Sequence, residues 1–403
     1  MKINLKTHFF ALLALTLTSC SSQRLSKTQW PTEPVPVAEN ARLACKAWSH
    51  ALPSHISHLS LSADSQRLYV STSAEPGKTL AALRLYGANG KMRWFRKLPQ
   101  PVKAQDVSSD GALIAVNNYD GKLRVFDASG NLQWEREHMG KPIVLSKAKR
   151  VLLFNDDDSE SDMAFVSYDF KGQETGRVTV AKNESKQAEP LDMYSAIDES
   201  GVAVAMADQS VAFYDIDGKL LASGKLPGRT VSIVTQGLPK PRLFAISTEE
   251  GGDQTLTSLV ATPQGNFEKK WERALERRHE TIRLNGDTLV LYGNTQQGQA
   301  LSGFHAATGE RLWQRSYPTP ATYPSLIFGT ESYSTVLFDA GTAAGELELL
   351  AVGNTGSAVW RGSVEATSGV FSYAFAPQGP AIAVGAGEPG RGAVHYYKTC
   401  SGK

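Results

Sequence analysis

Short runs of alternating hydrophobic and polar residues, separated by turn sequences, fill most of the chain. These runs form a repeated block, and its clearest copy is residues 106–137, DVSSDGALIAVNNYDGKLRVFDASGNLQWERE. DVSS ends one strand, ALIAV and LRVFD alternate as strands do, and LQWERE forms a last strand with a tryptophan. Asp-Gly and Ser-Gly pairs between them are typical of tight hairpin turns. Four strands in about 40 residues is the repeat length of one β-propeller blade.

The same block recurs along the chain. Copies that end in tryptophan lie at 83–94, 259–271, 304–313 and 350–360, and copies that keep the turn but lack the tryptophan lie at 166–178 and 212–223. Their last strands fall about 40 to 48 residues apart, a spread that variable loops allow.

The two ends of the repeat region complement each other. Three strands follow Trp360 (VFSYAFA, AIAVG and VHYYK) without a fourth, whereas residues 43–52 (LACKAWSHAL) read as an isolated fourth strand. Pairing them would close the ring and remove open sheet edges. The sequence therefore predicts an all-β, eight-bladed propeller over residues 43–403, with four antiparallel strands per blade. Seven blades is the alternative, if residues 180–260 hold one blade rather than two.

The first twenty residues indicate export. Lys2 and Lys6 precede an apolar run of nine residues (FFALLALTL), too short to span a bilayer, and Leu17-Thr18-Ser19-Cys20 follows. This order is similar to a bacterial lipobox, in which the cysteine thiol accepts diacylglycerol. We expect a signal peptide at 1–19, lipidation of Cys20 with palmitate-type chains, and a flexible tether over 20–42. An ordinary signal peptide that contains a cysteine is the alternative.

The cysteines support closure of the ring. If Cys20 carries lipid, Cys45 and Cys400 remain, and they lie in the two segments that we expect to pair. In an oxidising compartment this favours a Cys45–Cys400 disulfide, with two free thiols as the alternative.

The charge balance gives no hint of a polyanionic partner. Removal of residues 1–19 takes Lys2 and Lys6 and no acid, so the 42 basic residues become 40, against 40 acidic ones. A neutral body with interspersed charge predicts no footprint for nucleic acid or for an anionic membrane surface.

Residues 307–313 (ATGERLW) resemble the tryptophan-docking motif of quinoprotein-type (PQQ-like) propellers, A-x-D-x-x-T-G-x-x-x-W, and residues 128–134 and 354–360 are looser copies. The resemblance implies that each repeat tryptophan packs between neighbouring blades, as a large flat side chain at a seam would. The blade-docking residues are then Trp48, Trp94, Trp134, Trp271, Trp313 and Trp360.

Within that superfamily, an exported eight-bladed lipoprotein is similar to the propeller lipoproteins of the outer-membrane barrel-assembly machine. The resemblance implies a monomeric scaffold, anchored in the outer membrane and facing the periplasm, that binds envelope proteins, without enzymatic activity. Ser21 after Cys20 favours the outer membrane weakly, because Asp there resembles an inner-membrane retention signal. A periplasmic quinone-dependent dehydrogenase or a small-ligand-binding propeller is the alternative.

No motif predicts a catalytic, cofactor or metal site. The acidic run 156–162 lacks the glycine and glutamate of a calcium loop, and residues 385–390 (GAGEPG) precede a strand rather than a helix. The charged patch 276–279 (ERRH) lies between two blocks. It reads as a solvated loop or, less strongly, as a loop that contacts a partner.

Overall fold

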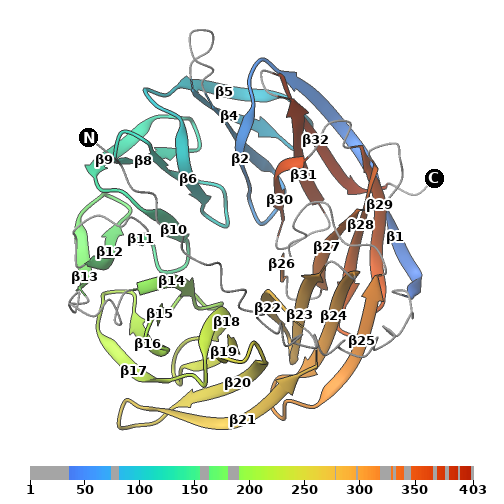
Figure 1. The fold of residues 1–403 in the computed structure, drawn as a ribbon. Coiled ribbons are helices and arrows are strands. Elements are labelled where there is room, and N and C mark those ends of the chain that lie inside the picture. Colours follow the sequence, from blue (N-terminus) through green and yellow to red (C-terminus); the bar gives the residue numbers. More distant parts are fainter. Residues whose placement is uncertain are drawn as a thin grey trace, which may run out of the picture.

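The fold is all-β. The computed structural model describes residues 36–73, 81–154, 163–179, 190–276, 278–295, 298–317, 328–329, 333–339, 346–365, 370–376, 381–388 and 391–400. Within these ranges every regular element is a strand, β1 to β32, and the sheets stand around a ring (Figure 1). The predicted propeller class is confirmed.

Six sheets have four antiparallel strands each, in chain order from one edge to the other. Three of them comprise β2–β5 (Ile56–Leu61, Arg67–Thr72, Ala82–Gly87, Met92–Lys97), β6–β9 (Val102–Val107, Leu113–Asn118, Lys122–Asp127, Leu132–Glu137) and β10–β13 (Lys141–Leu145, Arg150–Phe154, Met163–Asp169, Glu174–Thr179). The others comprise β14–β17 (Pro190–Ser195, Gly201–Met206, Ser210–Asp215, Leu220–Lys225), β18–β21 (Arg229–Gln236, Arg242–Thr248, Gln254–Ala261, Phe267–Leu275) and β22–β25 (Thr281–Asn285, Thr288–Thr295, Gly298–His305, Arg311–Tyr317).

The seventh sheet has eight strands in the order β26-β27-β28-β29-β1-β32-β31-β30. It contains β26–β29 (Phe328–Gly329, Tyr333–Asp339, Glu346–Gly353, Ala358–Glu365), β30–β32 (Val370–Phe375, Ala381–Glu388, Arg391–Thr399) and β1 (Val37–Leu52). Strand β1 runs antiparallel to β32 over Ala44–Leu52 and parallel to β29 over Val37–Leu43. The N-terminal strand therefore closes the ring, as predicted.

The described strands form seven hydrogen-bonded sheets, which is the alternative count, and the expectation of eight separate blades is not confirmed. The reason differs from the one anticipated, because residues 180–260 contribute to two sheets, β14–β17 and β18–β21. The number falls to seven because β1 joins two sets of strands into one sheet. The expected tether, 20–42, also overlaps β1, since residues 37–42 already belong to the sheet.

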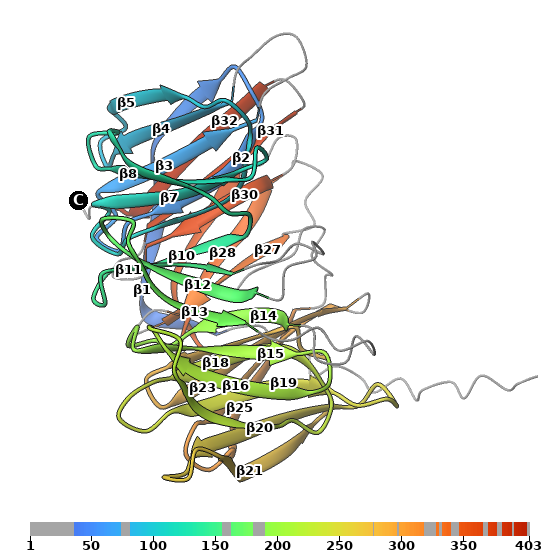
Figure 2. The same ribbon diagram turned by 90° about the vertical axis from the view of Figure 1, so that its left-hand side faces the viewer.

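Each sheet is most buried in its middle strands and most exposed at its outer one. Strands β7 and β15 are buried throughout, whereas β5 and β9 alternate or are largely exposed. Hydrophobic clusters join neighbouring sheets around the ring, such as the one that joins β19, β21, β22 and β23. Figure 2 shows the ring edge-on, with the sheets stacked side by side. Burial of apolar side chains between sheets is thus what holds the ring together.

The predicted disulfide is present. Cys45 in β1 and Cys400 just after β32 are bonded, with 5.0 Å between their Cα atoms and 355 residues between them in sequence. The Cys400 N–H also donates to the Leu43 carbonyl at 2.8 Å. The closing strand is therefore tied to the C-terminus covalently and by backbone hydrogen bonds.

Candidate functional site at a seam between sheets

Five tryptophans of the outer strands reach across a seam. The indole Nε1 of each donates to a backbone carbonyl in the turn before the outer strand of the next sheet. The pairs are Trp48–Ala88 (3.1 Å), Trp94–Ala128 (2.9 Å), Trp134–Phe170 (3.1 Å), Trp271–Ala306 (3.1 Å) and Trp313–Asn354 (2.6 Å). These five blade-docking positions thus lie in equivalent contacts around the ring.

A glycine of the same turn lies against each indole ring. At Gly309, where φ is +69°, a Cβ atom would stand 2.6 Å from Cε3 of Trp271. Gly90, Gly130, Gly172 and Gly356 have the same relation to their tryptophans, all with positive φ. The Gly of the repeat turn is needed both for the left-handed conformation and for room beneath the ring.

A second donor accompanies each of these tryptophans, two residues along the strand, and sequence reasoning missed it. Arg96 donates to Gly130 O at 2.7 Å, Arg273 to Gly309 O at 3.1 Å, Arg315 to Gly356 O at 3.3 Å, and Arg136 to Gly172 O. His50 Nε2 lies 2.7 Å from Gly90 O in the same place. The signal was available in the sequence as a recurring Trp-x-Arg or Trp-x-His. We call this contact a tryptophan latch. It consists of the tryptophan, the second donor and the glycine turn of the next sheet.

The sixth tryptophan, Trp360, is 2 % exposed and lies in register with Arg42 of β1, and its indole Nε1 has no hydrogen-bond partner among the described residues. Two other seams have no tryptophan. Buried Val178 faces Gly218 between β10–β13 and β14–β17, and Phe267 lies against Gly224 between β14–β17 and β18–β21. The ring is therefore latched unevenly, and the β14–β17 sheet has no tryptophan latch on either side.

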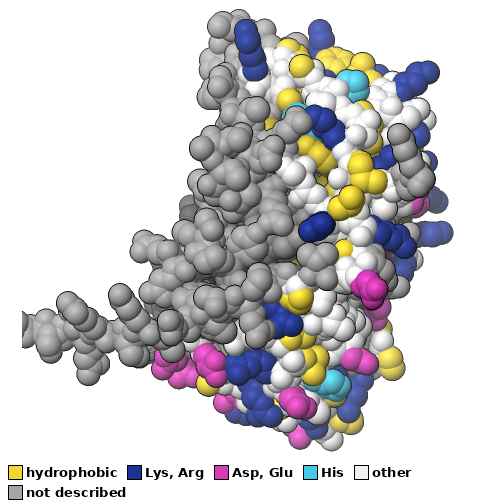
Figure 3. All heavy atoms as spheres, turned by 90° about the vertical axis from the view of Figure 1, so that its right-hand side faces the viewer, with side chains coloured by type: hydrophobic (Ala, Val, Ile, Leu, Met, Phe, Trp, Pro, Cys, Tyr) yellow, Lys and Arg dark blue, Asp and Glu magenta, His cyan; other side chains and the backbone are white. Residues whose placement is uncertain are grey.

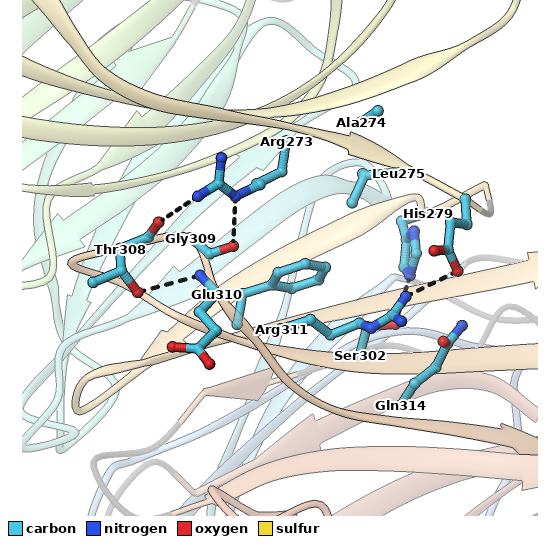
Figure 4. A pocket seen from close by; sticks show the side chains of 12 residues that line it. Arg273, Ala274, Leu275, His279, Ser302, Thr308, Gly309, Glu310, Arg311 and Gln314 are labelled. Carbon is cyan, nitrogen blue, oxygen red and sulfur yellow. Dashed lines mark hydrogen bonds and ion pairs between the residues drawn. The ribbon is translucent and has the colours of Figure 1, made fainter.

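A pocket of about 480 Å³ opens at the latched seam between β18–β21 and β22–β25 (Figure 4). Buried Phe304 and half-buried Leu275 give it apolar surface, while exposed Glu276 and Arg311 form an ion pair 2.9 Å long beside it. The other lining residues are Arg273, Ala274, His279, Ser302, Thr308, Gly309, Glu310 and Gln314. The pocket therefore offers apolar surface with charges of both signs at its border.

The linker between β21 and β22 shapes this pocket. His279 is 2 % exposed, and its Nε2 lies 3.2 Å from Ser302 Oγ. Its backbone N–H donates to Gln254 Oε1 at 2.6 Å, and its carbonyl accepts from Gln254 Nε2 at 3.0 Å. Ser302 is also 2 % exposed, so this Ser–His pair holds the linker in place at the base of the pocket.

The same linker carries charge at the surface. Burial raises the pKa of the Glu280 carboxyl, and the positive charge of Arg278 opposes that rise. Arg278 is exposed, and Arg277 lies outside the described residues. The charged patch predicted at 276–279 therefore stands next to the pocket, with its histidine buried and Glu276 and Arg278 outside.

Other sequence candidates fall elsewhere. Cys20 and the acidic run 156–162 lie outside the described residues, whereas Gly385 and Gly387 lie in β31, whose partner across the hairpin is another strand. No group of three or more His, Cys, Asp or Glu side chains within the described ranges is placed to hold a metal ion. Among the same residues, no helix has the length and hydrophobicity that a bilayer crossing requires.

No protein-family model and no curated protein matches the chain by sequence. Among solved structures, the crystal structure of BamB from Moraxella catarrhalis is similar, with a TM-score of 0.55 and 15 % sequence identity. The match covers 89 % of this chain and 99 % of that one. At this identity the likeness concerns the fold alone, and it agrees in fold with the propeller resemblance predicted from the sequence. The chain has a BamB-like β-propeller fold.

Proposed function

We propose that this protein is a lipid-anchored propeller of the cell envelope that binds other proteins and serves outer-membrane protein assembly. The observation that carries the binding role is the seam pocket, whose apolar surface and charged border suit a segment of another protein. The lipobox that ends at Cys20 supports the anchor, and the BamB-like fold supports the setting.

The anchor and the fold are linked through one strand. Residues 21–36 separate Cys20 from β1, and β1 closes the ring. We further propose that β26–β29 and β30–β32 with β1 act as two blades, which makes the ring eight-bladed. An experimental structure with eight inner strands equally spaced around the axis would agree with this, and seven would contradict it.

Lipidation is tested by metabolic labelling with radioactive palmitate. We expect label in the wild-type protein and none in Cys20→Ser, and we expect the labelled protein to sediment with outer-membrane vesicles in a density gradient. Absence of label from the wild-type protein would contradict the anchor, and label in the inner-membrane fraction would contradict the location.

Partner binding is tested by cross-linking and purification from detergent-solubilised membranes. The pocket variant Arg278→Glu/Glu310→Lys reverses two charges beside the pocket and should lose the partner. The matched control, Lys240→Glu/Glu250→Lys, makes the same changes on exposed loops of the β18–β21 sheet and should keep it. If no barrel-assembly subunit co-purifies with the wild-type protein, the assembly role fails.

We propose a binding role and not an enzymatic one. The alternative, a quinone-dependent dehydrogenase, predicts dye-linked oxidation of alcohols or sugars after the protein is mixed with calcium and quinone. We expect no activity above that of the cofactors alone, and measurable turnover would reverse this part of the proposal.

A further inference from the structure

Exposed cations gather on one part of the ring's perimeter. They stand on four strands and one adjoining turn, which we call the basic sector: Arg361 on β29, Arg42 on β1, Lys398 on β32, Lys91 in the turn before β5, and Arg93 and Lys97 on β5. Among the side chains described for these strands, the one carboxylate is Glu39. Six cations against one carboxylate contrast with the near-even balance of the whole chain, which has 42 basic and 40 acidic residues.

The strands of the basic sector are neighbours although they are far apart in sequence. Leu43 pairs with Arg361, and Cys45 pairs with Lys398, which brings β1, β29 and β32 together. The hydrogen bonds from Trp48 to Ala88 O and from His50 to Gly90 O join β1 to the turn before β5. The part of the surface around β1 that is visible in Figure 3 shows Lys and Arg interspersed with hydrophobic side chains.

Other outer strands offset their cations with acids. Lys122 pairs with Glu135 of β9 at 2.8 Å, Arg177 with Glu174 of β13 at 2.7 Å, and Lys269 with Glu272 of β21 at 3.0 Å. Among its described side chains the basic sector has only Glu39 to offset six cations, so its positive potential extends into solvent. At physiological ionic strength that potential reaches about 8 Å, enough to attract a nearby anionic surface.

Large apolar side chains are exposed among these cations. Leu43 on β1 is 53 % exposed, and Met92 and Phe95 on β5 are 50 % and 38 % exposed. Basic residues mixed with exposed leucine and aromatic side chains are typical of surfaces that lie in a membrane interface. An acidic protein surface would need a matching apolar patch at the same place, whereas a bilayer interface accepts cations and apolar side chains together.

We infer that the basic sector rests on an anionic phospholipid leaflet. The inference takes its geometry from the proposed lipid anchor. Sixteen residues (21–36) connect Cys20 to β1, and a flexible chain of that length has a mean reach of about 20–24 Å. The strand nearest the bilayer is then β1, which lies in the middle of the sector.

The test uses the mature chain from residue 20 with Cys20→Ser, so that binding depends on the folded body and not on the lipid. Its co-sedimentation is measured with vesicles of phosphatidylcholine alone and of phosphatidylcholine with phosphatidylglycerol, at low and high salt. We expect binding to the anionic vesicles only, weakened by salt. Each cation near such a surface contributes roughly fivefold to partitioning. The variant Arg42→Gln/Lys91→Gln/Arg361→Gln/Lys398→Gln should therefore bind at least tenfold more weakly.

The matched control, Lys147→Gln/Lys171→Gln/Lys219→Gln/Lys240→Gln, removes the same charge from exposed positions elsewhere on the ring and should bind within twofold of the parent. Circular dichroism checks that both variants are folded. Equal loss of binding in both variants, or no binding of the parent to anionic vesicles, would overturn the inference. An acidic protein would then be the better candidate to bind the basic sector. Neither result bears on palmitate labelling or on partner purification, so failure here is distinct from failure of the proposed function.

Discussion

At the scale of single residues, the ring depends on a small contact that is repeated. A tryptophan, an arginine or histidine two residues later, and a glycine with positive φ meet at five seams. The indole buries apolar area, and both donors satisfy backbone carbonyls that the turn leaves without strand partners. The glycine is the part of this contact that no other residue can replace.

We predict that Gly309→Ala is much more destabilising than Gly252→Ala. Both glycines have positive φ, +69° and +89°, so both variants bear a backbone cost of about 1 kcal/mol. Only at Gly309 does the new Cβ meet the Trp271 ring, whereas nothing lies within 4 Å at Gly252. Overpacking should add about 1–3 kcal/mol at Gly309, measured as the difference in free energy of unfolding by urea. Equal losses of unfolding free energy in the two variants would show that the Trp271 ring can move aside without an energetic penalty.

Asp106 should make stability fall as pH rises. Its carboxylate accepts the Val144 N–H at 2.7 Å across the seam between β6 and β10, and burial raises its pKa to about 6, while backbone donors and Lys141 oppose that rise. The folded state holds the proton more tightly than the unfolded state, whose pKa is 3.8. This carboxyl's contribution is therefore full below about pH 4 and is lost between pH 4 and 6, by roughly 2 kcal/mol.

Urea unfolding of the wild-type protein and of Asp106→Asn at pH 4 and pH 7 measures this effect. Between pH 4 and pH 7 the wild-type protein should lose roughly 2 kcal/mol of unfolding free energy relative to the Asn variant. A difference that is independent of pH would mean that Asp106 keeps an ordinary pKa.

At the scale of elements, β1 does more than complete a sheet. Its second half pairs with β32 as the expected fourth strand, and its first half pairs in parallel with β29. Trp360 of β29 lies in register with Arg42 of β1, and its buried indole Nε1 has no hydrogen-bond partner among the described residues, unlike the five latch tryptophans. The strand therefore supplies the missing blade edge without supplying a latch.

We predict that Cys45→Ser/Cys400→Ser folds but loses stability. The disulfide closes a loop of 355 residues, so its removal restores much entropy to the unfolded chain, by about 3–5 kcal/mol if the bond is unstrained. Calorimetry should show a lower Tm, and wild type under reducing conditions should behave in the same way. Cys20→Ser serves as the control and should leave the Tm unchanged.

Local patterns explain why the strands, the turns, the closing strand and the disulfide could be predicted. Alternation and Asp-Gly or Ser-Gly turns are properties of adjacent residues, and the two cysteines lie in segments that strand counting already paired. The pairing of residues 37–42 with β29 could not be predicted, because VAENAR reads as a polar linker and its partner edge is more than 300 residues away. The pocket at Glu276 and the basic sector depend in the same way on which strands become neighbours.

At the scale of the whole molecule, the seams are not equivalent. The β14–β17 sheet has no tryptophan latch on either side. Its seam with β10–β13 is packed by apolar side chains and also carries a partly exposed ion pair, Arg150–Asp217 at 3.2 Å. Such pairs contribute little to stability in water. The ring should therefore open first at this sheet.

Native-state hydrogen exchange tests that expectation. Amides of β15 and β16 should exchange faster than those of β7 and β8, whose sheet has a tryptophan latch on both sides. Trp134→Ala should then raise exchange in β9 and in β10–β13 while leaving β22–β25 unchanged. Uniform protection around the ring would mean that the latches do not set local stability.

Strand β1 also determines how the ring would bear a mechanical load. A pull on its N-terminus acts along the strand axis, so the hydrogen bonds to β29 and β32 are loaded in shear and must fail together, not one after another. Beyond Cys45 the force passes through the disulfide to the C-terminal strand. A force applied through the tether should therefore not unfold the propeller strand by strand from its N-terminal end.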